Sequence, residues 1–178
     1  QVLHKLRRLG ITQTVMMTGD SERTAAAIAK QVGVDRFFAE VLPEDKANFV
    51  QQAKAEGHTV VMIGDGINDS PALSAADIGI AINSGAAIAR EIADVTIKAD
   101  SLEELVFLKT VANALQHRVS ANYRFVLSFN STLILLGALG ILQPAASAML
   151  HNLSTLGISL KSMTNLVQTP SSVPQITK

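Results

Sequence analysis

The stretch TVVMIGDGINDSPAL, residues 59–73, carries the strongest structural signal in this sequence. It opens with a β-branched apolar run, which predicts a buried strand over 59–63. The glycines at 64 and 66 then bracket Asp65, and a short helix is expected over 70–76. Ligands of α/β proteins bind at the carboxyl ends of parallel strands. The stretch therefore predicts an α/β fold with its chemistry in the loop after this strand.

The same alternation of strand and helix continues on both sides of this stretch, from residue 1 to about residue 100. Further strands are expected at 14–17, 37–41, 78–82 and 95–98, and further helices at 2–9, 24–31, 43–55 and 86–93. Ser21 is placed to cap the helix over 24–31, and Gly33 to end it. Such alternation predicts a Rossmann-like parallel sheet covered by helices on both faces.

A second motif, Thr18-Gly19-Asp20, follows the strand at 14–17. A threonine hydroxyl and a glycine amide at a strand end can donate to phosphate oxygens, and the ammonium of Lys46 can neutralise their charge. Taken alone, Thr-Gly-Asp is also a common turn, and a lysine on an exposed helix is by default a solvated charge. The order of the motifs along the chain favours the phosphate interpretation.

Carboxylates on the loop after residue 63 predict a Mg²⁺ site. Mg²⁺ is a hard cation that takes oxygen ligands, and Asp65 and Asp69 supply carboxylates there. Gly64 and Gly66 let the loop turn sharply, and Asn68 can hold the loop or the shell around the metal. A purely structural turn is the weaker interpretation, because the loop directly follows a buried strand.

From residue 101 the sequence changes in kind. Residues 101–142 predict one long helix: an amphipathic stalk over 101–124, then 18 uncharged residues over 125–142. Eighteen helical residues span roughly 27 Å, close to the thickness of a bilayer core. After Gln143-Pro144, a second stretch over 144–161 ends at Lys161. We expect a transmembrane α-helical hairpin after the α/β domain, and a disordered tail over 168–178.

Charge and composition exclude several classes of protein. The chain has 178 residues, no cysteine and 15 basic against 15 acidic residues, which excludes disulfide frameworks and thiol nucleophiles. Neither half carries the basic patch of a nucleic-acid binder. Basic residues flank the hairpin on one side, so the positive-inside rule predicts that both ends of the chain are cytosolic. Two buried helices of a soluble protein are the alternative to the hairpin.

Polar residues inside the two apolar stretches are candidates for binding a transported ion, because polar side chains are costly in a bilayer. They are Asn130 in the first stretch, and His151, Asn152, Ser154 and Thr155 in the second. A neutral imidazole is a good ligand for divalent transition metals. The alternative interpretation is that His151 and Asn130 make hydrogen bonds between helices.

Thr18-Gly19-Asp20 and Gly64-Asp65-Gly66-Ile67-Asn68-Asp69-Ser70-Pro71-Ala72-Leu73 resemble the phosphorylation-domain motifs of P-type ATPases, which belong to the haloacid-dehalogenase-like superfamily. The resemblance implies that Asp65 coordinates Mg²⁺ with Asp69 in support. It also implies that Thr18 touches the phosphoryl group, that Lys46 stabilises its charge and that Asp20 lies beside them. The long helix and hairpin resemble the last two transmembrane helices of the heavy-metal-transporting branch of this family. That resemblance implies a pump of the plasma membrane.

One departure from the family matters most. Its nucleophile is the aspartate of an Asp-Lys-Thr-Gly motif, whereas here Asp45-Lys46 is followed by Ala47-Asn48. The chain is therefore interpreted as a C-terminal fragment that is inactive alone. The resemblance implies that ATP is bound mainly by a missing nucleotide-binding domain, and that the partners are this domain, the actuator domain, other transmembrane helices and the bilayer.

The resemblance also bears on the transported metal. Copper pumps of this branch carry a methionine where His151 stands, which argues against copper(I) and for a divalent ion such as zinc, manganese, iron or cobalt. Asn152 stands where zinc and cobalt pumps carry an acidic residue, so the metal stays open. A membrane-anchored phosphatase of the same superfamily and a non-catalytic, Mg²⁺-binding regulatory fragment are the alternatives to the pump.

Overall fold

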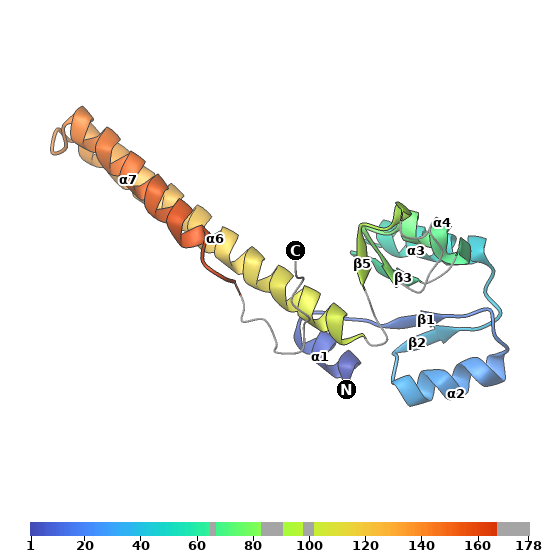
Figure 1. Cartoon of the computed structure of the whole chain (residues 1–178). Helices are drawn as coiled ribbons and strands as arrows, with labels where there is room; N and C mark the ends of the chain where they lie inside the picture. Colours follow the sequence, from blue (N-terminus) through green and yellow to red (C-terminus); the bar gives the residue numbers. More distant parts are fainter. Residues whose placement is uncertain (65–66, 83–90, 98–101, 167–178) are drawn as a thin grey trace. The chain divides into compact units, whose positions relative to one another are not determined.

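The computed structural model describes residues 1–64, 67–82, 91–97 and 102–166. The chain divides into two compact units, Gln1–Lys109 and Thr110–Lys178. The first unit contains α1 (Val2–Arg8), β1 (Val15–Met17), α2 (Glu22–Val32), β2 (Arg36–Phe38), α3 (Pro43–Ala55), β3 (Val61–Gly64), the 3₁₀ turn η1 (Ile67–Asp69), α4 (Ser70–Ala75), β4 (Ile78–Ile82) and β5 (Val95–Ile97) (Figure 1). This order confirms the predicted α/β alternation.

The strands of the first unit pair in parallel. β1 pairs with β2, and β3, β4 and β5 form a second sheet in that order. The sequence predicted one parallel sheet. In the described part of the chain there are two, because no ladder of hydrogen bonds joins β1 to β3. Both strands thus lie at the edge of a sheet.

Strand β4 shows how the second sheet is covered on both faces, since successive side chains point to opposite sides. Ile80 on one face is 1% exposed and packs with Leu6, Ile97 and Leu105. Ala81 points to the other face, where it packs with Leu73 of α4. Fully burying a leucine or isoleucine side chain contributes about 1.5–3 kcal/mol. Core packing on both faces therefore fixes β4 in register.

Several predicted boundaries moved by a few residues. The strand expected over 37–41 ends at Phe38, because Glu40 takes a positive φ of 54°. Gly33 ends α2 in the left-handed conformation, as predicted. Ser21 precedes α2, but its hydroxyl bonds the hydroxyl of Thr24 and caps no backbone amide. Most of the helix expected over 86–93, and the tail over 168–178, lie outside the described residues.

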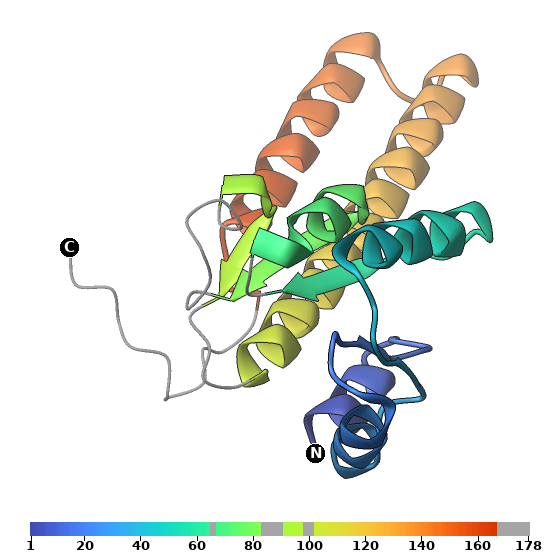
Figure 2. The same cartoon turned by 90° about the vertical axis from the view of Figure 1, so that its right-hand side faces the viewer.

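The second unit is an antiparallel pair of helices. α6 (Glu103–Ala138) begins before the unit boundary, and α7 (Pro144–Ser162) returns beside it (Figure 2). The amide of Asn122 donates to the hydroxyl of Ser162 at 3.1 Å, and Arg118 donates to the carbonyl of Thr164 at 2.6 Å. Large apolar side chains point outward, with Ile134 73% exposed and α7 burying none of its residues.

The structure contains a pair of helices where the hairpin was predicted, with one difference in length. The helix expected over 101–142 ends at Ala138, because Gly140 turns the chain with a φ of 73°. The uncharged stretch over 125–142 is thus helical only in its first part. Among the described residues, we find no helix that combines the length and the apolar character needed to cross a membrane. The membrane-crossing part of the prediction is not confirmed.

Candidate functional site

Gly64 ends β3, and the carboxylate of Asp69 lies directly over it. A Cβ atom built on Gly64 would stand 2.6 Å from the Cβ of Asp69 and 2.9 Å from its Oδ2. Real Cβ contacts are not that short, so any side chain at position 64 would displace Asp69. Glycine is therefore required here by close approach, and Asp69 is fixed at the carboxyl end of the strand.

Lys46 on α3 reaches the same carboxylate. Its Nζ donates to Oδ1 of Asp69 at 2.8 Å, and the two side chains are only 14% and 13% exposed. Breaking such a pair leaves a largely buried charge without its partner, which is costly. The pair holds a cation and an anion in fixed positions beside the end of β3. A phosphate or a metal ion arriving there would meet charges of both signs.

The Thr18-Gly19-Asp20 turn follows β1 and is closed by its own side chains. The hydroxyl of Thr18 donates to Oδ2 of Asp20 at 2.8 Å, and the N–H of Asp20 donates to Oγ1 of Thr18 at 3.1 Å. Three backbone hydrogen bonds tie the turn to the segment after β2. They join Thr18 N to Phe38 O, Glu40 N to Asp20 O and Val41 N to Thr18 O. The turn is exposed, but its backbone is held on both sides.

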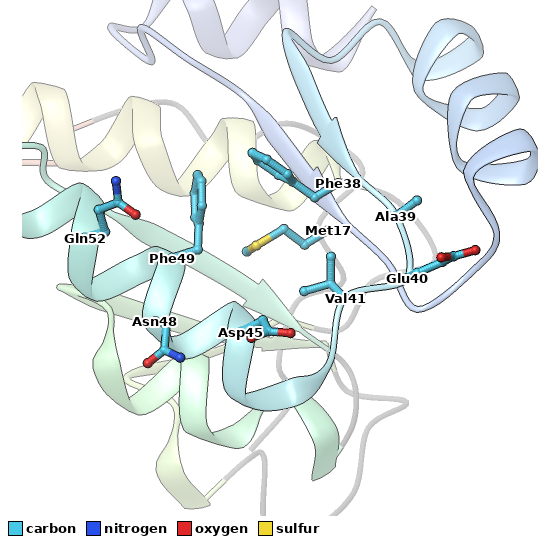
Figure 3. A pocket seen from close by; sticks show the side chains of 9 residues that line it. All are labelled: Met17, Phe38, Ala39, Glu40, Val41, Asp45, Asn48, Phe49 and Gln52. Carbon is cyan, nitrogen blue, oxygen red and sulfur yellow. The ribbon is translucent and has the colours of Figure 1, made fainter.

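A cavity of about 350 Å³ is lined by residues of β1, of β2 and the segment after it, and of α3 (Figure 3). Met17, Phe38 and Phe49 form its apolar wall, and the rings of Phe38 and Phe49 lie 5.1 Å apart. Glu40 and Asp45 add carboxylates to its lining. Asp45 immediately precedes Lys46, and the backbone N–H of Glu40 donates to the carbonyl of Asp20. The cavity thus adjoins the elements that hold both motifs, and its lining was not singled out in the sequence.

The structure brings together only part of the predicted phosphate and Mg²⁺ set. Asp65 and Gly66 lie outside the described residues. Asn68 is exposed, and within the described ranges no bond joins the Thr18 turn to the Lys46–Asp69 pair. Among those residues, no three His, Asp or Glu side chains gather closely enough to hold a metal ion. The roles assigned to these residues remain predictions.

Three aspartates at the opposite ends of the strands were missed by the sequence analysis. Asp35, Asp77 and Asp94 each stand directly before a strand and accept the backbone N–H of the residue opposite on the neighbouring strand. The donors are Thr14 at 2.7 Å, Val60 at 2.8 Å and Gly79 at 2.8 Å. The sequence does offer a signal for them, because each of these strands is preceded by a small or β-branched residue followed by Asp. The three pairs are Val34-Asp35, Ala76-Asp77 and Ala93-Asp94.

These bonds have an electrostatic consequence. Hydrogen bonds from the side chain and backbone of Thr14 hold the pKa of Asp35 below its ordinary value of 3.8, and Arg7 lowers it further. The backbone N–H of Val60 and the ammonium of Lys54 lower the pKa of Asp77 in the same way. Hydrogen bonds to the ionised form favour that form. These carboxylates are therefore charged structural groups at neutral pH.

In the helix pair, the structure brings together most of the predicted polar residues. Nδ1 of His151 and Oδ1 of Asn130 lie 2.9 Å apart, across α7 and α6. The hydroxyls of Ser154 and Thr155 both donate to the carbonyl of His151. Asn152 is exposed, and in the described residues no bond ties it to this group. The contact between His151 and Asn130 fits both the ion-binding and the packing interpretation.

Known proteins match most of the chain in sequence and in fold. A haloacid dehalogenase-like hydrolase model matches residues 1–77. The zinc-exporting P-type ATPase of Mycobacterium marinum is 42% identical over 159 residues, which cover 89% of this chain and 22% of the relative. The manganese-exporting P-type ATPase of Mycobacterium tuberculosis (strain H37Rv) is also 42% identical over the same lengths. A zinc-transporting PIB-type ATPase of known structure superposes with a TM-score of 0.83 at 33% identity, covering 91% of this chain and 26% of that one.

Residues 1–77 are thus similar to haloacid dehalogenase-like hydrolases, and the α/β unit has a fold of that kind. Over about nine-tenths of its length the chain is homologous to heavy-metal P-type ATPases. It spans 22% of the length of these curated relatives.

Proposed function

We propose that the chain forms part of an ATP-driven pump that exports a divalent transition-metal cation through an aspartyl-phosphate intermediate. The observation that carries the proposal is the largely buried ion pair of Lys46 and Asp69, fixed at the end of β3 beside Gly64. Phosphoryl transfer depends on positioned charges of this kind. The homology with P-type ATPases gives the pair its context.

In this proposal each motif has a separate task. The hydroxyl of Thr18 and the amide of Gly19 bind phosphoryl oxygens, and Asp20 orients the hydroxyl that it already accepts from. Lys46 stabilises the negative charge that spreads over those oxygens in the transition state. Gly64 and Gly66 let the loop approach closely, with Asn68 in support.

The donor set around Asp69 fits Mg²⁺. Lys46 takes Oδ1 of Asp69, and in the described part of the chain no hydrogen bond reaches Oδ2. A carboxylate oxygen of this kind, together with Asp65, suits a hard cation that keeps several waters. When bound, Mg²⁺ would neutralise charge on the phosphoryl oxygens, and Lys46 would hold the Asp69 carboxylate in place.

The phosphorylated aspartate comes from a segment outside this sequence. The family motif Asp-Lys-Thr-Gly is not present here, and ATP would bind mainly to another domain. Within the described residues, β1 and β3 each have one edge without a partner strand, which supports this part of the proposal because each could accept a further parallel strand. Without that segment, the chain alone would be inactive.

The helix pair is proposed to lie in the plasma membrane, with both ends of the chain in the cytosol. From residue 105 onward the sequence has no acidic residue, and apolar side chains cover the outside of the pair. His151 and Asn130 would contribute to the path of the transported ion, with Asn152, Ser154 and Thr155 beside them. The imidazole of His151 offers nitrogen to a divalent transition metal.

The first test is phosphoenzyme formation in a full-length parent pump. We expect Asp65→Ala to abolish the acid-stable phosphoenzyme formed from labelled ATP. The exposed Glu44→Gln on α3, which removes one charge away from the motifs, serves as the control and should keep it. A normal phosphoenzyme yield in Asp65→Ala would overturn the assigned role. If the parent hydrolysed p-nitrophenyl phosphate with Mg²⁺ alone, with no dependence on a transition metal, the phosphatase alternative would be favoured instead.

The second test concerns the ion path. His151→Ala should leave phosphorylation by inorganic phosphate intact but lose metal-stimulated ATP hydrolysis, because only the ion site is changed. Ser159→Ala, one turn beyond Thr155 on the same helix, is the matched control. Unchanged metal stimulation in His151→Ala would assign this histidine to helix packing.

A further inference from the structure

A second cavity, of about 270 Å³, opens between the two helices of the second unit. Its lining comes from both helices: Asn122, Phe125, Ser154, Gly157, Ile158 and Lys161. Gly157 leaves the space open, because a Cβ built there would meet nothing within 4 Å. A space of this size is many times larger than one water molecule needs, so it can take part of an organic ligand. The contact between His151 and Asn130 does not contribute to its lining.

The lining combines a cation with polar and apolar groups. In the described part of the chain, the ammonium of Lys161 has no hydrogen-bond or ion-pair partner. Asn122 and Ser154 add an amide and a hydroxyl, and Phe125 and Ile158 add an apolar wall. Lys161 can bind an anion as a point charge, while its stem and the wall suit hydrocarbon. This pattern fits an amphiphile with a negative head.

The charges around the cavity favour the same kind of ligand. Arg118 on α6 lies near the level of Lys161, as its bond to the carbonyl of Ser162 indicates. Arg118 is engaged by the carbonyls of Ser162, Thr164 and Asn165, so its position is fixed. The sequence has no Asp or Glu after Glu104, so no acidic side chain of this stretch competes with an incoming anion for the basic residues. Basic pockets between helices of this kind bind lipid head groups.

We propose that this cavity binds one anionic phospholipid. Its phosphate would lie at Nζ of Lys161, within reach of the amide of Asn122, and an acyl chain would run over Phe125 and Ile158. The inference rests on the proposed function, in which the helix pair lies in a membrane, and adds a specific lipid site to it.

The test uses the complete 178-residue chain in detergent. Native mass spectrometry measures retention of phosphatidylglycerol, with phosphatidylcholine and inorganic phosphate as separate probes. We expect one retained phosphatidylglycerol and little phosphatidylcholine. Inorganic phosphate should not displace the lipid, because it lacks the acyl contacts. Displacement by phosphate would indicate a simple anion site and overturn the lipid proposal.

Two pairs of variants locate the binding. Gly157→Leu fills the cavity without changing charge, and Lys161→Gln removes its cation; each should weaken retention about tenfold or more, the equivalent of about 1.4 kcal/mol. The controls are Gly137→Leu, at an open helical glycine outside the lining, and Arg124→Gln, which removes a charge outside the lining. Both controls should stay close to the unmodified chain. Equal losses in Lys161→Gln and Arg124→Gln, or full retention in Gly157→Leu, would reduce the effect to surface charge and overturn the site.

Circular dichroism of every variant excludes loss of folding as the cause. The outcome is independent of the phosphoenzyme test, since lipid retention needs no ATP. A full-length parent that forms phosphoenzyme but retains no phosphatidylglycerol would show that another segment covers the cavity, and only the lipid site would fail. A parent that retains the lipid but forms no phosphoenzyme would overturn the pump and leave the lipid site standing.

Discussion

Aspartates stand at both ends of the parallel strands, and those at the amino ends use their side chains to accept backbone N–H groups. Asp35, Asp77 and Asp94 each accept one, from a residue in the neighbouring strand or directly before it, and Asp35 and Asp77 also contact side chains. At the carboxyl ends, Asp20 and Asp69 accept from side chains, those of Thr18 and Lys46. A bond to the backbone fixes strand register, whereas a bond between side chains can be exchanged for a ligand. The amino ends therefore serve stability, and the carboxyl ends are available for chemistry.

The largest expected effect tests this contrast directly. In the parent pump, Asp69→Asn removes the charge that faces Lys46, and the phosphoenzyme level should fall about 100-fold or more, the loss typical of a preorganised electrostatic group. Asp94→Asn is the matched control, because it changes the same residue type at the other end of the strands. It should leave the phosphoenzyme level of folded protein unchanged. Similar losses in both variants would remove the distinction between the two ends.

The next effect concerns stability at the amino end of β4. Gly79→Ala places a Cβ about 2.8 Å from the carbonyl oxygen of Leu73, which is backbone and cannot move aside easily. Overpacking of this kind lowers the free energy of unfolding by about 1–3 kcal/mol. Urea unfolding of the chain measures it. Gly137→Ala, where a Cβ meets nothing, is the control and should be neutral or slightly stabilising; equal destabilisation of both would contradict the steric argument.

The smallest effect is a dependence of stability on pH. Because the folded state holds the pKa of Asp77 below its ordinary 3.8, this carboxylate stabilises the fold above that pH and loses its contribution as the pH falls through the lower, folded pKa. We expect Asp77→Asn to lower the midpoint of urea unfolding at neutral pH and to flatten its decline in acid. Glu44→Gln, at an exposed carboxylate away from the strand ends, should leave the acid decline unchanged. An unaltered acid decline in Asp77→Asn would show that other carboxylates carry the pH dependence.

The order of elements in the α/β unit could be predicted because it follows from local patterns. The run of apolar residues before Gly64 and the stop at Gly33 act within a few residues of the chain. The same reasoning placed Gly64-Asp65-Gly66 and Thr18-Gly19-Asp20 after strands. It predicted Lys46 as a candidate without indicating its partner, since the residues of the Lys46–Asp69 pair lie 23 positions apart in sequence.

Features that depend on pairing across the chain could not be predicted. The aspartates at the amino ends become recognisable only when strand register is known, because each carboxylate bonds the residue opposite. The division into two sheets depends on hydrogen bonds between strands, which have no signal in either strand alone. The end of α6 at Ala138 depends on the left-handed conformation of Gly140, which the uncharged run around it conceals.

The guanidinium of Arg118 has a consequence for the order in which the second unit assembles. It bonds the last carbonyls after α7, those of Ser162, Thr164 and Asn165, from a position more than 40 residues earlier in the chain. Ser162 is the last residue of α7 and the other two follow it, so in the described part of the chain no helical amide further along reaches these carbonyls. The bonds that Arg118 makes can therefore form only after the two helices have met. Hydrogen exchange of the amides at the end of α7 would report how often the pair opens there.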